Sequence, residues 1–332
     1  MIETIYIEEE IKDHPKTREI CSRFPQTRLI TCQYYGEIFN RKNQNFRMQK
    51  TRPALILAKK FKNFVLDAPA GYGIGGKRNF YFSHMLNCIY DCRYCFLQGM
   101  YRSAHYVIFV NYEDFAGAIV NKINESQQCN SYFFSGYDCD SLALEPVTHF
   151  ADYYLPLFRQ YSNAWVELRT KSTQIRSLLK IDPVPNCVIA FSFTPEEISN
   201  VLEHGTPSID KRLDAMVKLQ QYDWKLGLRF DPLIYQDNYK ELYDKLFNTI
   251  FSKISVECLH SVSLGSLRFP ETYLRNIVRL YPDEKLFSGP LEKHHGMFTY
   301  YSHIEQSMLE YCKNSLSRYI PADIFYSCDY AA

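Results

Sequence analysis

The sequence lacks the features that define several large classes of protein. It has no run of about 18 apolar residues, so we expect no transmembrane helix and no membrane partner. The N-terminal segment has no apolar signal-peptide run either, and we expect a cytoplasmic protein. Net charge is almost absent, with 38 basic against 37 acidic residues. This balance argues against tight non-specific binding of nucleic acid but leaves a local basic patch open.

Cysteine is plentiful, but its pattern excludes a disulfide scaffold. The chain holds 11 cysteines in 332 residues, an odd number, and disulfide scaffolds are short and cysteine-dense. Most of the cysteines are dispersed, and we expect these to be small buried hydrophobes. Cys88, Cys92 and Cys95 instead lie close together and form one distinctive cluster.

Short β-like runs alternate with amphipathic helical patterns along most of the chain. After Asn111 the apolar residues recur at helical spacing, and we expect this residue to cap a helix with Asp114 at the capping-box position. The predicted strands are Asn79–Ser83, Tyr106–Val110, Ser131–Phe134, Trp165–Leu168, Cys187–Phe193, Leu226–Phe230 and Leu259–Leu264. The other predicted helices are Pro146–Gln160, Ile209–Tyr222, Asn238–Phe251 and Pro270–Leu280.

This alternation predicts an α/β fold with a parallel sheet and crossover helices. About six strand–helix units suit a partial or complete barrel, whose chemistry takes place at the carboxyl ends of the strands. Residues 1–75 fit the alternation poorly. We therefore predict an N-terminal appendage over 1–75, followed by the barrel with a C-terminal extension over 76–332.

The clustered cysteines have the spacing Cys88-x3-Cys92-x2-Cys95 and directly follow a predicted strand. A [4Fe–4S] cluster normally takes four cysteine ligands, so three of them leave one iron open to an outside ligand. In radical enzymes of this type that ligand is S-adenosylmethionine, whose reductive cleavage releases a 5′-deoxyadenosyl radical. A zinc site with His84 as fourth ligand is the alternative, but zinc prefers paired C-x2-C knuckles. The spacing and the aromatic residues around Cys95 favour an iron–sulfur cluster.

Several segments of the sequence resemble the spore photoproduct lyase family. The similar segments are SHMLNCIYDCRYCFLQ from Ser83, VELRTKS (Val166–Ser172), FSFTPEEI (Phe191–Ile198), EHGTPSIDKRLDAMVKL (Glu203–Leu219) and the closing IPADIFYS. The resemblance implies a partial (β/α)6 TIM-type barrel and a radical S-adenosylmethionine enzyme with a [4Fe–4S] cluster. It also implies that the adenosyl radical abstracts hydrogen from a thymine dimer in DNA and reverts it to two thymines.

Matching motifs carry family roles over to five residues of this chain. Cys88, Cys92 and Cys95 would be the cluster ligands. Lys171 and Ser192 match positions that contact S-adenosylmethionine. A cation suits the carboxylate of this cofactor, and a hydroxyl suits its ribose or carboxylate. Taken alone, the lysine could equally be a solvated surface residue and the serine a core hydroxyl.

The hydrogen-donating side departs from the family pattern. The resemblance places Tyr137 where the lyases have a hydrogen-donating cysteine, and Cys139 where they have a serine that contacts the cofactor. Tyr94 precedes the third cluster cysteine as in the family, but Phe96 follows it where the family has a tyrosine. Tyr94, Tyr137 and Cys139 are therefore the candidate catalytic residues, and Cys139 is also a candidate cofactor contact. Either Cys139 has become the donor, or the substrate differs, or Cys139 is an inert buried thiol.

Other polar residues near predicted strand ends could belong to the site or serve structure, as caps or as ion pairs. They are Asp140, Glu145, Arg229, Asp231 and Arg268. Glu203 and His204 could bind substrate or only shape the turn before Gly205.

The leading hypothesis is a radical lyase that repairs a pyrimidine lesion in DNA and takes electrons from a donor such as a flavodoxin or ferredoxin. The altered donor loop and the near-zero charge leave open a radical enzyme whose substrate is a peptide, a modified nucleotide or a small metabolite. A non-catalytic nucleic-acid-binding module with a structural metal is the third hypothesis.

Overall fold

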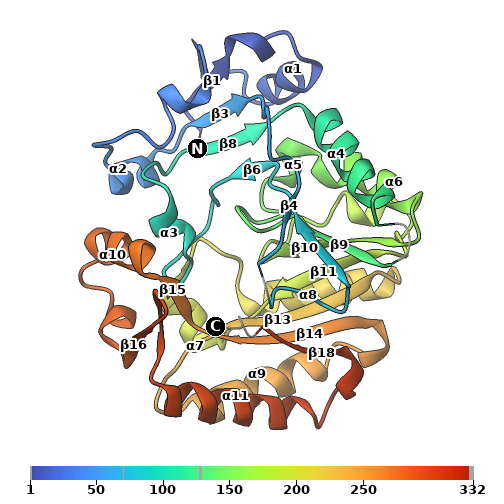
Figure 1. The fold of residues 1–332 in the computed structure, drawn as a ribbon, viewed down its shortest axis with the longest axis vertical. Coiled ribbons are helices and arrows are strands. Elements are labelled where there is room, and N and C mark those ends of the chain that lie inside the picture. Colours follow the sequence, from blue (N-terminus) through green and yellow to red (C-terminus); the bar gives the residue numbers. More distant parts are fainter. Residues whose placement is uncertain (1, 70, 127–128, 329–332) are drawn as a thin grey trace.

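Two sheets organise the molecule. The computed structural model describes residues 2–69, 71–126 and 129–328. A small sheet near the N-terminus lies above a large curled sheet in Figure 1, and helices α9 and α11 cover the opposite side. The segment that contains the three clustered cysteines lies between the two sheets.

The large sheet has the strand order β18-β14-β13-β11-β10-β9-β5-β4. Neighbouring strands from β5 to β18 are parallel, and β4 pairs antiparallel at the other edge. Across the described residues β4 and β18 do not pair, so the barrel is open. This architecture confirms the predicted partial barrel. The strands are β4 (Leu66–Asp67), β5 (Arg78–Tyr81), β9 (Ser131–Phe134), β10 (Ala164–Thr170), β11 (Cys187–Ser192), β13 (Lys225–Leu233), β14 (Leu259–Ser266) and β18 (Phe325–Ser327).

Helices alternate with the parallel strands from β5 to β18, as the sequence predicts, and none is predicted, or found in the described chain, between β10 and β11. There a loop with one 3₁₀ turn (Leu178–Lys180) replaces the crossover helix. The helices that follow the barrel strands are α4 (Tyr112–Asn124), α5 (Glu145–Thr148), α6 (Phe150–Arg159), α7 (Glu196–Leu202), α8 (Ile209–Gln221), α9 (Tyr239–Phe251), α10 (Glu271–Leu280) and α11 (Ser302–Leu316).

Strand β9 shows why this sheet is buried on both faces. Phe133 points outward, where its ring centroid lies 5.2 Å from that of Phe80 on β5 and 5.5 Å from that of Phe158 on α6. Its neighbours Tyr132 and Phe134 belong to a separate aromatic cluster inside the barrel. Successive side chains of a strand point to opposite faces of the sheet. In an unbroken apolar run one set of side chains therefore packs against the helices and the other set packs inside the barrel.

The small sheet has the order β2-β1-β3-β8-β6. The sequence alternation placed the strand at 106–110 among the barrel strands, but β8 pairs parallel with β3 instead. Both strands are completely buried, so each suits the middle of either sheet and only the tertiary pairing separates them. The small sheet thus joins segments from both sides of residue 75. Its strands are β1 (Thr4–Glu8), β2 (Arg28–Cys32), β3 (Leu55–Ala58), β6 (Met85–Leu86) and β8 (Tyr106–Phe109), with helices α1 (Pro15–Ser22) and α2 (Phe46–Thr51).

Two local predictions are wrong. The single helix predicted over 146–160 is broken into α5 and α6 by His149, whose backbone is left-handed at φ 46°. The Asn111 side chain makes no capping hydrogen bond to α4, because it bonds the backbone N–H and C=O of Lys60 and the Asp114 carboxylate. It therefore ties the start of α4 to the segment that follows β3.

Between β14 and α11 the chain forms a small three-stranded sheet next to α10. Its strands are β15 (Arg268–Pro270), β16 (Leu291–His294) and β17 (Met297–Tyr300). No helix within the described ranges is both long and apolar enough to cross a membrane.

Candidate active site

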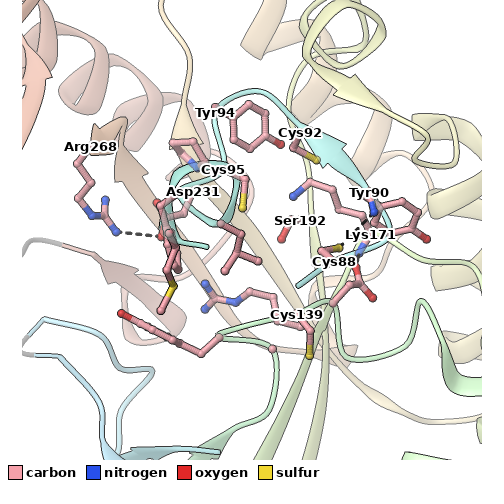
Figure 2. A pocket seen from close by; sticks show the side chains of 18 of the residues that line it. Cys88, Tyr90, Cys92, Tyr94, Cys95, Cys139, Lys171, Ser192, Asp231 and Arg268 are labelled. Atoms are coloured by element: carbon pink, nitrogen blue, oxygen red, sulfur yellow. Dashed lines mark hydrogen bonds and ion pairs between the residues drawn. The ribbon is translucent and has the colours of Figure 1, made fainter. Parts of the chain in front are cut away.

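A cavity of about 340 Å³ opens at the carboxyl ends of the barrel strands. The cysteine loop and the loop that follows β9 form two of its walls, and the ends of β10, β11, β13 and β14 form its base. Residues of β15, β17 and α10 complete the lining. The three clustered cysteines and the three candidate cofactor contacts, Lys171, Ser192 and Cys139, all line this one cavity (Figure 2). The cavity therefore lies where the active site of a barrel enzyme is expected, at the carboxyl ends of the strands.

The cysteine loop is held by backbone pairing to a distant segment. Strand β7 (Asp91–Cys92) pairs antiparallel with β12 (Glu203–His204), and the N–H of Arg93 donates to the carbonyl of Leu202 at 2.8 Å. The loop ends in α3 (Leu97–Met100), which packs directly on α10. A Cβ atom on Gly99 would lie 2.2 Å from the carbonyl oxygen of Tyr273, so this contact requires glycine.

A buried ion pair supports the loop from behind. The carboxylate of Glu203 pairs with Arg212, and both side chains are fully buried. Glu203 also accepts hydrogen bonds from the hydroxyls of Tyr94, Thr194 and Ser199. Burial alone would raise the pKa of this carboxyl group, but Lys171 and Arg212 lower it below its usual value. Glu203 therefore holds the cysteine loop rather than forming part of the cavity wall.

The cysteine side chains surround a common space instead of converging on one point. Within the described part of the chain, no three His, Cys, Asp or Glu side chains gather as ligands of a single metal ion. In a cluster each thiolate binds a different iron, so the ligands stand further apart. His84, the proposed fourth ligand of a zinc site, stacks on Phe150 with ring centroids 3.8 Å apart and does not line the cavity. The zinc alternative with this histidine is therefore wrong.

Positive charge faces the thiols. Burial raises the pKa values of the Cys92 and Cys95 thiols above their usual value, and the ammonium group of Lys171 offsets only part of this rise. The Cys88 sulfur accepts a hydrogen bond from the backbone N–H of Tyr90 at 3.4 Å. Ligand thiols must lose their protons, and N–H donors and cations stabilise the resulting anions. The donor set and its surroundings fit a three-cysteine iron–sulfur cluster.

Two of the three candidate cofactor contacts, Lys171 and Ser192, stand beside the thiols. Figure 2 shows Lys171 and Ser192 between Cys88 and Cys92. The ammonium nitrogen of Lys171 lies 5.4 Å from the centre of the Tyr94 ring, and Ser192 is the last residue of β11. The sequence reading of the lysine as a solvated surface residue is wrong, because its side chain lies in the cavity wall.

Asp140 and Glu145 fix the backbone of the loop after β9. Asp140 accepts hydrogen bonds from the Thr170 hydroxyl at 2.6 Å and from the Lys171 N–H at 2.7 Å. Glu145 accepts from the N–H of Ala151 at 3.2 Å and so caps α6. The structural alternative is confirmed for Glu145. Asp140 both lines the cavity and ties this loop to the end of β10.

The two candidate donors occupy different surroundings. The Tyr137 ring stacks on Tyr81 with centroids 4.4 Å apart and lies 5.7 Å from the Phe96 ring. Cys139 also lines the cavity, but its thiol points away from the three cluster thiols in Figure 2 and packs with Met85 in the apolar cluster below the small sheet. The tyrosine therefore packs beside the residue that follows Cys95, whereas the Cys139 thiol is directed away from the cluster thiols.

Charged residues of the barrel interior divide into two groups. Arg229 is fully buried and pairs with Glu167 at 2.7 Å, so its role is structural. Burial would raise the pKa of Glu167, but Arg229 and Arg169 lower it to about 2. Asp231 and Arg268 pair at 3.2 Å and line the cavity.

Arg169 and Tyr273 also line the cavity, and neither was predicted from the sequence. Arg169 could have been found from the alternation of side chains along β10. It stands two residues before Lys171 and four after Trp165, so all three share one face of the strand. The Trp165 ring packs against the aromatic cluster inside the barrel.

Comparisons with known proteins agree with one another. The model of the spore photoproduct lyase family matches residues 1–324. The spore photoproduct lyase of Bacillus subtilis (strain 168) is 23% identical over 291 residues, which are 85% of this chain and 83% of that protein. The Geobacillus sp. (strain Y412MC61) enzyme of the same name is 22% identical over 245 residues, or 71% and 72% of the two chains.

Solved structures show the same fold. A mutant spore photoproduct lyase superposes with a TM-score of 0.85 at 19% identity, covering 99% of this chain and 98% of that chain. A second mutant, with bound AdoMet and dinucleoside spore photoproduct, also has a TM-score of 0.85 at 17% identity, covering 100% and 99%.

Proposed function

Because this chain belongs to the spore photoproduct lyase family of radical S-adenosylmethionine enzymes, we propose that it repairs a thymine-dimer lesion of the spore photoproduct type in DNA. One observation carries the proposal: three thiols, a lysine and a serine face a single cavity at the carboxyl ends of the barrel strands. A relative has been solved with AdoMet and dinucleoside spore photoproduct, the ligand pair that such a cavity would hold.

Cys88, Cys92 and Cys95 would bind a [4Fe–4S] cluster, and Lys171 and Ser192 would bind the polar groups of S-adenosylmethionine. When bound, these cofactors supply a 5′-deoxyadenosyl radical. The lysine contributes a cation for the cofactor's carboxylate, and the serine a hydroxyl that donates or accepts. Tyr94 would position the loop, since its hydroxyl is bound by the buried Glu203.

The rest of the cavity suits a pyrimidine pair. Asp231 provides a hydrogen-bond acceptor, and Arg268 beside it provides donors. The edge of a thymine base carries an N–H group that needs an acceptor and C=O groups that need donors. The ring of Tyr273 and the Met297 side chain supply apolar contacts for the bases. Arg169 lies at the base with its guanidinium 4.8 Å from the centre of the Tyr72 ring.

Tyr137 is the hydrogen donor that the geometry supports best. After hydrogen abstraction and bond cleavage, the product carbon radical needs one hydrogen atom. The phenol O–H bond of Tyr137 would break and a C–H bond would form, leaving a phenoxyl radical stacked on Tyr81. Phe96 beside it cannot pass on a hydrogen atom. The low-potential electron donor, with a proton from solvent, would therefore restore the tyrosine.

The donor assignment can be tested by turnover in D₂O, where a phenol or thiol hydrogen becomes deuterium. Wild-type product should carry one deuterium per repaired lesion. Tyr137→Phe should lose that label while still forming 5′-deoxyadenosine, and Cys139→Ala should retain it. If only Cys139→Ala abolishes the label, Cys139 is the donor.

The function is tested with anaerobically reconstituted enzyme, a flavodoxin or ferredoxin as electron donor, and dinucleoside spore photoproduct. We expect thymine monomer together with 5′-deoxyadenosine. Formation of 5′-deoxyadenosine without thymine would overturn the assigned substrate and favour a radical enzyme for a different substrate, the alternative that the altered residues Tyr137 and Phe96 support. The cytoplasmic location stays a prediction.

A further inference from the structure

Positive charge is concentrated in the segment from Arg41 to Arg52, which we call the basic segment. Its sequence RKNQNFRMQKTR contains five basic residues and no acidic one, whereas the whole chain carries 38 and 37. Lys42, Arg47 and both terminal arginines are exposed. Such a local excess in a nearly neutral chain creates a positive field at one place on the surface.

Little of this charge is neutralised by the protein. Arg41 donates a hydrogen bond to the backbone carbonyl group of Glu37, and a carbonyl group carries no net charge that could neutralise the arginine. The guanidinium group of Arg52 lies 3.8 Å from the Glu3 carboxylate, and both side chains are exposed. For Lys42 and Arg47 no ion pair with any described residue is recorded. The positive field therefore faces solvent.

The basic segment lies against the outer side of the cysteine loop. The ammonium group of Lys50 donates to the backbone carbonyls of Cys88 and Tyr90, both at 3.4 Å. Gln49 accepts a hydrogen bond from the N–H of Ala104 at 2.9 Å and so anchors α2 to the chain beyond the loop. No residue of the segment is among those that line the cavity. It therefore adjoins the cluster site from outside, without access to the substrate.

An exposed apolar side chain stands within the segment. Met48 is 69% exposed, directly follows Arg47 and stands two residues before Lys50 on α2. Electron-transfer complexes use small interfaces, and methionine and arginine are enriched in interface cores. Complementary charges then speed the encounter of the two proteins.

We propose that the basic segment is the docking surface for an acidic one-electron carrier of the flavodoxin or ferredoxin class. This inference rests on the proposed function, which requires such an electron. The carrier is oxidised by one electron, the cluster next to Lys50 is reduced by one, and no bond or proton moves at the surface. DNA is the less suitable occupant, since a lesion must reach the cavity and no part of the segment lines it.

The test compares two double charge reversals in the reconstituted full-length enzyme. Lys42→Glu with Arg47→Glu changes the basic segment. Lys225→Glu with Lys253→Glu is the matched control, since both lysines are exposed. Lys225 begins β13, and Lys253 lies in the turn between α9 and β14, so both stand at the opposite end of the barrel strands. Production of 5′-deoxyadenosine is measured with reduced flavodoxin over a salt series, and separately with saturating dithionite.

With flavodoxin we expect the first variant to lose about tenfold or more in rate at low salt, with a weaker salt dependence than wild type. The control and the dithionite rates should match wild type. Equal flavodoxin rates in all three proteins would overturn the proposal, as would a loss confined to binding of lesion-containing DNA, which would make the segment a nucleic-acid surface. If wild type forms no 5′-deoxyadenosine with dithionite, the proposed function itself fails, which is a distinguishable result.

Discussion

The cluster side and the donor side of the cavity differ in how far they follow the family pattern. The cluster side keeps its three thiols with Lys171 and Ser192, and the β7–β12 pairing and a buried ion pair support it. The donor side carries Tyr137 opposite Phe96, and Asp140 supports it through bonds to the end of β10. Since each side has its own loop and its own support, the proposed function is compatible with a change in hydrogen return that leaves the proposed cluster ligands in place.

The largest effect should come from the cluster side. Cys92→Ala removes one of three thiolate ligands, and we expect loss of the iron–sulfur cluster and of all 5′-deoxyadenosine formation. Iron and sulfide content with visible absorption measures this directly. Cys187→Ala, which removes a buried thiol from β11, is the control and should keep full cluster content. Equal iron content in the two variants would show that Cys92 is not a ligand.

The buried ion pair between Glu203 and Arg212, which supports the cluster side, should contribute strongly to the free energy of unfolding. Glu203→Ala leaves Arg212 buried without its partner, so we expect the free energy of unfolding to fall by about 3–5 kcal/mol. Glu197→Ala breaks an exposed pair with Lys245 and should cost about 1 kcal/mol or less. Chemical denaturation measures both. Similar losses in the two variants would mean that the buried pair does not hold the loop.

A pH effect should arise on the donor side, where Glu145 caps α6. Burial raises the pKa of this carboxyl group from 4.5 to about 7. Between these two values Glu145 binds more protons in the folded state than in the unfolded state, so its contribution to stability is greatest below pH 4.5 and is lost as the pH rises to about 7. The loss for this one group is about 2–4 kcal/mol. Glu145→Gln cannot titrate, and its unfolding free energy should lack this decrease when both proteins are denatured at pH 5 and pH 7.5.

The smallest effect concerns cofactor affinity. Lys171→Met removes a charged donor but keeps the length of the side chain, so binding of S-adenosylmethionine should weaken by about tenfold to a hundredfold. Equilibrium dialysis on reconstituted protein measures the dissociation constant without turnover. Lys180→Met, in the 3₁₀ turn after β10, is the control. Unchanged affinity in the first variant would exclude Lys171 as a cofactor contact.

Local patterns made part of this site predictable. The three cysteines lie in one short loop after a strand, so their spacing alone indicates that they act together. The alternation predicted strands that end at Leu168 and Phe193, close to Lys171 and Ser192. The choice of these two residues depended on the family resemblance.

Long-range contacts were not predictable from the sequence. The hydroxyl of Tyr94 binds a carboxylate 109 residues away, and no local pattern pairs the two. The strand β8 is equally apolar on both faces, so nothing in its own residues selects the small sheet. In both cases the determining partner comes from a distant part of the chain.

The glycine contact between α3 and α10 has a mechanical consequence. Gly99 leaves no space between the helix that follows Cys95 and the backbone of Tyr273, and Asn276 clamps the same point through a 2.9 Å hydrogen bond to the Gly99 carbonyl. A movement of α10 would therefore also displace α3, the helix in which the cysteine loop ends. Because Tyr273 of α10 lines the cavity, this contact joins the cavity wall to the end of the loop that carries the three cysteines.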